Sequence, residues 1–180
     1  LTTLRRRSSA GAARKTRACR TTRCTCTVVP RPQAGGVPPP TPARSPGARA
    51  VVAEAPWCGI GLTVCYDVRF PYLYRALAHA GARVLMVPAA FTRQTGKAHW
   101  HILLQARAIE TGSFIVAPAQ CGTHADGRRT YGHALIVSPW GEILAEAPTD
   151  DANAQAGAND GVVHADIDIT KVEKARNAIP

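Results

Sequence analysis

Short apolar runs alternate with amphipathic stretches along the chain from about residue 50 onward. Residues 60–64 are an apolar run of strand length, and in residues 83–87 four apolar residues follow Arg83, so we expect both segments to be buried strands. Between them, Pro71 suits the first position of a helix, and apolar residues at helical spacing continue until Gly81, a typical stop. A strand, a helix and a second strand in succession indicate an α/β arrangement.

The same alternation continues toward the C-terminus. Residues 98–110 place apolar side chains on one helical face, and Gly112 is expected to end that helix. Residues 113–117 predict a third buried strand. Further on, two apolar runs enclose the sequence Ser-Pro-Trp-Gly at residues 138–141, which predicts a hairpin over residues 134–145.

A half-exposed strand and a short helix are predicted at the end of the chain. Apolar and polar residues alternate strictly over residues 163–168, as in a strand with one solvated face. Thr170 and Glu173 have the spacing of a capping box, so a last helix is expected to begin at Thr170. The whole pattern predicts a layered α/β domain.

The first 50 residues have a different composition from the rest. They contain 11 of the 22 Lys and Arg residues and none of the 12 Asp and Glu residues, so the formal net charge of +10 originates there. They lack aromatic residues, Ile and Met, and hold seven of the 14 prolines. Because such a segment buries too little apolar surface to offset its conformational entropy, residues 1–45 are expected to be a disordered arm preceding a folded part, residues 46–180.

More specific functions for this arm have less support from the sequence. A basic arm binds nucleic acid through phosphates, but this one has no aromatic side chain to stack on a base, so no nucleic-acid partner is expected. An acid-free, Arg-rich start is typical of organelle transit peptides, although the prolines argue against one. Cys19, Cys24 and Cys26 lack a second CxxC or a nearby His for a metal site. No apolar run approaches the length of a membrane span.

Candidate chemistry concentrates where the first predicted strand ends. Residues 61–67 read Gly-Leu-Thr-Val-Cys-Tyr-Asp, which places Cys65 at the junction between a strand and a helix. A nucleophile on a sharp strand-to-helix turn is the layout of a nucleophile elbow. A single Cys in this position more often packs as an apolar residue, so the position alone leaves both interpretations open.

Residues 59–71, Gly-Ile-Gly-Leu-Thr-Val-Cys-Tyr-Asp-Val-Arg-Phe-Pro, resemble the nucleophile segment of the nitrilase superfamily, the carbon–nitrogen hydrolases. The resemblance covers about residues 46–180 and points to the amidase branch, which acts on small ω-amides and deaminated glutathione. It continues in order through residues 81–85, 87–92, 95–100, 104–110, 119–122, 131–133 and 139–141.

This resemblance implies a fold and a set of partners. The fold would be the C-terminal portion of the α-β-β-α sandwich of these hydrolases. The substrate would be a small-molecule amide, with no cofactor and no metal, and the complete protein would be a cytoplasmic homodimer without membrane association.

It also implies a mechanism based on a Glu-Lys-Cys triad, in which the thiolate attacks the amide carbon to form a thioester and water then releases the acid. Carried over to this chain, Cys65 is the nucleophile and the backbone N–H of Tyr66 is an oxyanion donor. Phe91 and Thr92, just beyond a strand end, are expected to line the substrate pocket.

The remaining two triad members have no counterpart that the resemblance identifies. Before Cys65 the only carboxylate is Glu54 and the only lysine is Lys15. We therefore expect family activity, hydrolysis of a small amide, to be impaired in this chain. The alternatives are a non-catalytic fragment or pseudoenzyme and, with less support, a basic-armed nucleic-acid-binding protein.

The family pattern suggests an origin for the arm. Residues 21–27, Thr-Thr-Arg-Cys-Thr-Cys-Thr, are a peptide that codons for Tyr-Asp-Lys-Val-His-Leu-Tyr can give when they are read one base out of register. That motif supplies the triad Lys in the family. A frame-shifted segment is the favoured interpretation of residues 1–45, and a genuine basic arm is the alternative.

Other residues near the site are expected to have structural roles: Asp67, Arg69, Glu110 and His133. Glu110 is expected to form a buried ion pair with an arginine such as Arg69.

Several histidines and cysteines complete the set of candidates. A Cys/His dyad of Cys65 with His99, His101 or His133 is a further alternative, to which the resemblance gives no support. Cys58 and Cys121 are expected to be core thiols. The spacing of His124, His133 and His164 matches no metal site, so no metal is expected.

Overall fold

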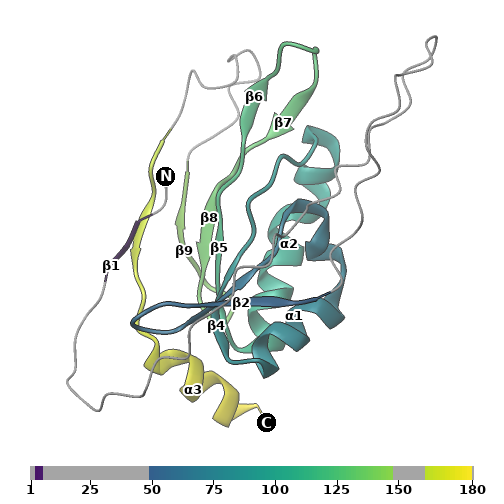
Figure 1. Ribbon diagram of the computed structural model, residues 1–180. Helices are drawn as coiled ribbons and strands as arrows, with labels where there is room; N and C mark the ends of the chain where they lie inside the picture. Colours follow the sequence, from purple (N-terminus) through teal and green to yellow (C-terminus); the bar gives the residue numbers. More distant parts are fainter. Residues whose placement is uncertain (1–2, 6–48, 148–160, 180) are drawn as a thin grey trace.

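The computed structural model describes residues 3–5, 49–147 and 161–179, and its centre is a six-stranded sheet in the order β2-β3-β4-β5-β8-β9 (Figure 1). Strands β3, β4 and β5 are parallel to one another, and the other neighbours pair antiparallel. The strands are β2 (Val51–Glu54), β3 (Gly59–Leu62), β4 (Ala82–Met86), β5 (Phe114–Ala117), β8 (Leu135–Val137) and β9 (Ile143–Glu146).

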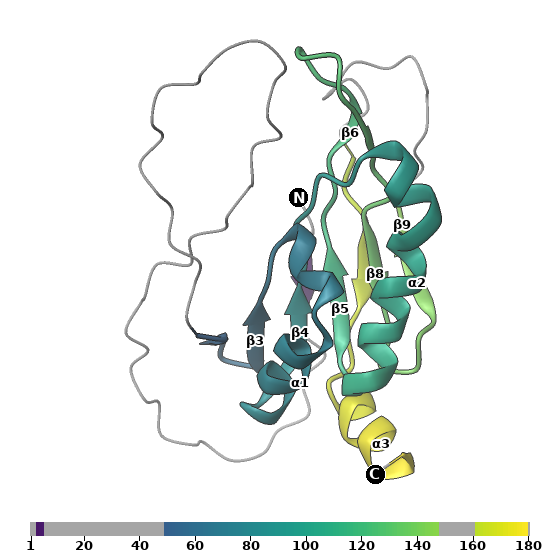
Figure 2. The same ribbon diagram turned by 90° about the vertical axis from the view of Figure 1, so that its right-hand side faces the viewer.

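Helices α1 (Pro71–His79) and α2 (Arg93–Thr111) cover one face of this sheet, as Figures 1 and 2 show. The 3₁₀ helix η1 (Cys65–Arg69) joins β3 to α1. A hairpin of β6 (Cys121–Thr123) and β7 (Arg129–Tyr131) extends beyond the sheet.

The opposite face of the sheet carries a second, smaller layer (Figure 1). It consists of β10 (His164–Asp166), which is parallel to β1 (Thr3–Arg5), and of helix α3 (Thr170–Ala178). The order of layers is therefore helix, sheet, sheet, and the predicted α/β class is confirmed. No helix in the described parts of the chain is both long and apolar enough to cross a membrane.

Both faces of the central strands are buried, because successive side chains alternate between the two faces. In β4, Leu85 packs under the helices, whereas its neighbour Val84 packs toward β10 and α3. In β8, Val137 and Ile136 divide in the same way. The strands therefore appear in the sequence as continuous apolar runs.

One helix start and one helix cap differ from the sequence prediction, whereas α3 begins at Thr170 as predicted. Helix α2 begins at Arg93 rather than at residue 98, because the Thr92 side chain caps it by accepting a hydrogen bond from the Thr95 N–H at 3.5 Å. At α3, Thr170 does not cap the helix. The Asp168 carboxylate instead accepts from the Thr170 N–H at 3.0 Å and from its hydroxyl at 2.8 Å.

Several strands were not predicted: β1, β2, β6 and β7. Of these, β1 lies in the segment expected to be a disordered arm, so residues 3–5 differ from that expectation by pairing with β10. Residues 6–48, and with them the proposed frame-shifted peptide and its cysteines, lie outside the described residues.

Candidate active site

The carboxyl ends of β3, β4 and β5 meet at one edge of the sheet, because these strands are parallel. Backbone hydrogen bonds join the loops that follow them. The Cys65 N–H donates to the Pro88 carbonyl at 2.8 Å, and the Ala89 N–H donates to the Pro118 carbonyl at 3.0 Å. The loop after β3, which carries Cys65, is thus fixed against the loop after β4.

Cys65 has an unusual backbone conformation, with φ of 45° in the left-handed region that residues with a side chain rarely adopt. Its side chain is half-buried and has no hydrogen-bond partner among the described residues. A strained residue at a turn from a strand into a helix is the geometry of a nucleophile elbow. The sequence prediction placed Cys65 at this kind of junction.

Asp67 holds the turn in place. Its N–H donates to the Val64 carbonyl at 2.9 Å, and its carboxylate accepts from the Val64 N–H at 2.9 Å. The intervening N–H of Tyr66 has no acceptor among the described residues, as is usual in the first turn of a helix. It is therefore available to an oxygen atom of a ligand.

Arg69 contacts residues from three segments of the site. Its Nη2 lies 3.3 Å from Nδ1 of His99. Its guanidinium lies 5.4 Å from the ring centre of Tyr66 and 5.3 Å from that of Phe91. Phe91 is buried and packs on Trp100, with ring centres 4.9 Å apart. Arg69 therefore has a packing role between η1 and α2.

Glu110 forms the predicted ion pair with an arginine, but the partner is Arg107 rather than Arg69, and the Glu110 side chain is 42% exposed rather than buried. The two residues are three positions apart on α2, with 2.6 Å between Nη1 of Arg107 and Oε2 of Glu110. Arg107 is buried, and its Nε donates to the Val68 carbonyl at 2.9 Å. Sequence reasoning missed Arg107, although an i, i+3 pair on one helix was an available signal.

A buried polar pair behind the turn was also missed. The hydroxyls of Thr63 and Tyr74 lie 2.7 Å apart, and the Thr63 hydroxyl donates to the Met86 carbonyl at 2.8 Å. Burial raises the pKa of Tyr74, and the hydrogen bond with Thr63 only partly opposes this effect. Tyr74 therefore remains a neutral phenol that fixes helix α1 against β3.

The three candidate histidines do not form the alternative dyad with Cys65. His99 contacts Arg69, while His101 and His133 both contact Glu146, and none of the three is hydrogen-bonded to Cys65.

The other described thiols differ from one another in their surroundings. Burial raises the pKa of Cys58 to about 12, so its side chain stays a thiol, whereas Cys121 is half-buried in β6.

The sequence model of the Carbon-nitrogen hydrolase family matches residues 6–177, and this chain belongs to that family. The matched range includes most of the arm, so the boundary expected near residue 45 stays a prediction.

Several of the curated relatives are named deaminated glutathione amidase. The one from Synechocystis sp. (strain PCC 6803 / GT-S) is 50% identical over 121 residues, which are 67% of this chain and 41% of the relative. The one from Homo sapiens is 46% identical over 121 residues, 67% of this chain and 34% of the relative. This chain thus spans about two-fifths or less of the length of these relatives.

Solved structures of the nitrilase superfamily have the same fold. Saccharomyces cerevisiae Nit3 is 31% identical with a TM-score of 0.66, covering 76% of this chain and 47% of that one. The C. elegans NitFhit protein is 37% identical with a TM-score of 0.64, covering 76% and 31%. A mutant of the amidase from Nesterenkonia sp. AN1, with acrylamide added at the active site cysteine, is 33% identical with a TM-score of 0.53, covering 63% and 42%.

Proposed function

We propose that Cys65 is the nucleophile of a small-amide hydrolase. The observation that carries this proposal is the left-handed, half-buried Cys65 at the carboxyl edge of the parallel strands. The amidase from Nesterenkonia sp. AN1, which forms a covalent adduct at its active site cysteine, supports the same assignment.

The reaction has two steps. The Cys65 thiolate attacks the carbonyl carbon of the amide, the C–N bond breaks, and the nitrogen takes up a proton and leaves as an amine, or as ammonia where the amide is primary. Water then attacks the thioester, which releases the carboxylic acid and restores the thiol. The oxyanion formed in each step would accept a hydrogen bond from the Tyr66 N–H, which is otherwise unpaired among the described residues.

Neighbouring residues are assigned by their place around Cys65. Asp67 orders the turn through Val64, and Phe91 and Thr92 follow β4 toward the same edge of the sheet, where we propose substrate contacts. Arg69 would support Phe91 from the solvent side.

Deaminated glutathione is the substrate that the relatives suggest. The curated relatives from Synechocystis and Homo sapiens are both named for that amide. Like them, the complete protein would act on a small molecule, and we propose that it does so as a homodimer.

Turnover by these 180 residues alone is expected to be low. The only carboxylate before Cys65 is Glu54 in β2, and the only lysine is Lys15, outside the described residues. A missing general base typically costs about 10²–10⁴ in rate and a missing oxyanion donor about 10²–10³, and the two effects do not simply multiply. The same observation favours a second candidate, a non-catalytic fragment.

Acrylamide labelling followed by peptide mass spectrometry tests the nucleophile. At pH 8 we expect Cys65 to be modified well before Cys58, whose pKa of about 12 leaves on the order of a thousandfold less thiolate than a free cysteine has. Cys58 is thus an internal control. Equal labelling of the two cysteines, or slower labelling of Cys65, would contradict the elbow assignment.

Release of the amine product from deaminated glutathione tests catalysis separately, with Cys65→Ser as the matched control. We expect labelling of Cys65 without turnover above that of the variant. Strong turnover that disappears in Cys65→Ser would confirm the nucleophile and overturn the proposed impairment. Turnover that survives the substitution would overturn the role of Cys65.

A further inference from the structure

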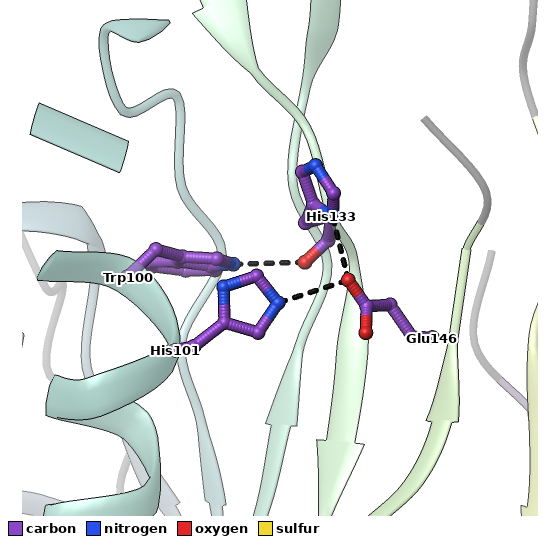
Figure 3. Close-up of polar contacts among 4 residues, drawn as sticks. All are labelled: Trp100, His101, His133 and Glu146. Carbon is purple, nitrogen blue, oxygen red and sulfur yellow. Dashed lines mark hydrogen bonds and ion pairs between the residues drawn. The ribbon is translucent and has the colours of Figure 1, made fainter. Parts of the chain in front are cut away.

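His101, His133 and Glu146 converge on one point, although they are far apart in sequence (Figure 3). His101 lies on α2, His133 in the turn before β8 and Glu146 at the end of β9. Their potential ligand atoms all lie within 4.8 Å of one another. Nε2 of His101 is 2.9 Å and Nδ1 of His133 is 2.5 Å from the same carboxylate oxygen, Oε1 of Glu146.

The positions of the hydrogen atoms in this cluster follow from the hydrogen-bonding chemistry of a carboxylate. An ionised carboxylate oxygen only accepts hydrogen bonds, so each of the two imidazole nitrogens facing it carries a hydrogen. Oε1 of Glu146 is the acceptor for both imidazoles. The cluster thus points two N–H groups at one anion.

A cation could replace both of these hydrogens. Among the described residues, no Lys or Arg lies within ion-pair distance of Glu146, so its charge is met only by the two imidazoles. Two imidazole nitrogens and a carboxylate oxygen are ligands that Zn²⁺ and its neighbours in the first transition row prefer.

The ligands are held in place before any ion binds. The Trp100 indole N–H donates to the His133 carbonyl at 2.8 Å, and the His133 ring stacks on Tyr131 with centres 4.1 Å apart. The His101 ring meets Tyr131 edge-on at 6.0 Å. The side chains of His101, His133 and Glu146 are 26%, 20% and 32% exposed, so the cluster remains open to solvent.

We propose that His101, His133 and Glu146 form a binding site for a divalent transition-metal ion, with Zn²⁺ as the probe and water in the remaining position. The site would join helix α2 to the two strands at the edge of the sheet. It does not depend on Cys65 or on the proposed hydrolase activity, because none of the three residues is hydrogen-bonded to Cys65. Sequence spacing did not predict this group, because 45 positions separate His101 from Glu146.

Zinc titration of the whole chain, followed by competition with a chromophoric chelator, tests the site. We expect one Zn²⁺ per chain and a loss of at least about tenfold in affinity for His101→Gln and for Glu146→Gln, since even residues behind metal ligands usually matter that much. His79→Gln is the matched control, because His79 is exposed at the end of α1. Far-UV circular dichroism with EDTA verifies that each variant is folded.

Cobalt spectroscopy on the unsubstituted chain keeps the test decisive if a variant fails to fold. Nitrogen and oxygen ligation gives only weak visible bands, which we expect, whereas cysteine ligation adds an intense near-ultraviolet charge-transfer band. The proposal would be overturned by that charge-transfer band, by the absence of saturable Zn²⁺ binding, or by an unchanged Zn²⁺ affinity in both folded variants. In any of these cases the cluster is a hydrogen-bonded clamp only.

Discussion

The guanidinium of Arg107 connects helix α2 to the turn that carries Cys65. Its Nε donates to the carbonyl of Val68, in the middle of η1, at 2.9 Å, and its charge lies 5.8 Å from the ring centre of Tyr74. Both contacts are inside the protein, where an unpaired carbonyl is costly. The pair with Glu110, in contrast, is at the surface end of the same side chain, since the Glu110 side chain is 42% exposed.

Arg107→Leu is therefore expected to destabilise the chain by about 1–3 kcal/mol, the usual effect of leaving a buried polar group unpaired. Glu110→Gln removes only a partly exposed ion pair and should cost no more than about 1 kcal/mol. Urea unfolding of both variants measures the difference. If Glu110→Gln proves as costly as Arg107→Leu, the bond to Val68 is not the important contact.

At the scale of single residues, the sequence predicted the features that depend on neighbouring positions in the chain. Cys65 and Asp67 were assigned to a turn because strand and helix signals flank them, and the structure has that turn. The bond from Arg107 to Val68 and the partners of Glu146 depend on which elements meet in space. Periodicity along the sequence carries no information about such contacts, so these partners were missed.

Helix α2 approaches the β6–β7 hairpin closely at Gly96. A Cβ atom on Gly96 would lie 2.3 Å from Cβ of Tyr131, far inside contact distance. Tyr131 cannot move freely, because its N–H donates to the Phe91 carbonyl at 2.9 Å. The glycine therefore permits the contact between helix and hairpin, despite its poor helix propensity.

Gly96→Ala is expected to destabilise the chain by about 1–3 kcal/mol, since overpacking outweighs the gain of about 1 kcal/mol in helix propensity. Thermal or urea unfolding measures the change. In a Tyr131→Gly background the clash is gone, and the same substitution should become neutral or stabilising. A similar loss in both backgrounds would exclude Tyr131 as the cause.

Among the elements, those with a complete local signal were predicted well. Helix α1 has Pro71 at its start, β5 is an uninterrupted apolar run, and β4 is apolar except for Arg83. The short strands β6 and β7 hold mostly Gly, Thr and Arg and pair with each other, and of their residues only Tyr131 belongs to the hydrophobic core. Strands of this kind have no hydrophobic pattern from which the sequence could predict them.

At the scale of the whole molecule, side chains near the ends of elements join the layers. Arg176 of α3 donates to the Thr111 carbonyl at 3.0 Å and to the Ala82 carbonyl at 2.9 Å, which links α3 to the end of α2 and the start of β4. Glu146 has the corresponding role at the other end of the sheet, where it joins α2 to β9.

The contribution of Glu146 should make stability depend on pH. Its pKa in the folded chain is lower than the ordinary value of 4.5, because the hydrogen bonds of His133 and His101 to the carboxylate outweigh the effect of burial. A carboxyl with a lowered folded pKa stabilises the fold fully above its unfolded pKa, and this stabilisation is lost as the pH falls through the folded value. The loss is therefore expected below about pH 4.5.

Urea unfolding of the unsubstituted chain and Glu146→Gln, with EDTA present to exclude metal effects, measures this contribution. The difference in unfolding free energy between them should be present at pH 7 and shrink toward pH 3. It should stay below about 1 kcal/mol, because the group is partly exposed and solvent screens it. Glu173→Gln, which removes an exposed carboxylate paired with Arg83, controls for the general loss of charge. A difference that is constant with pH, or equal to that of the control, would show that the His101–Glu146–His133 cluster does not stabilise the fold through the charge of Glu146.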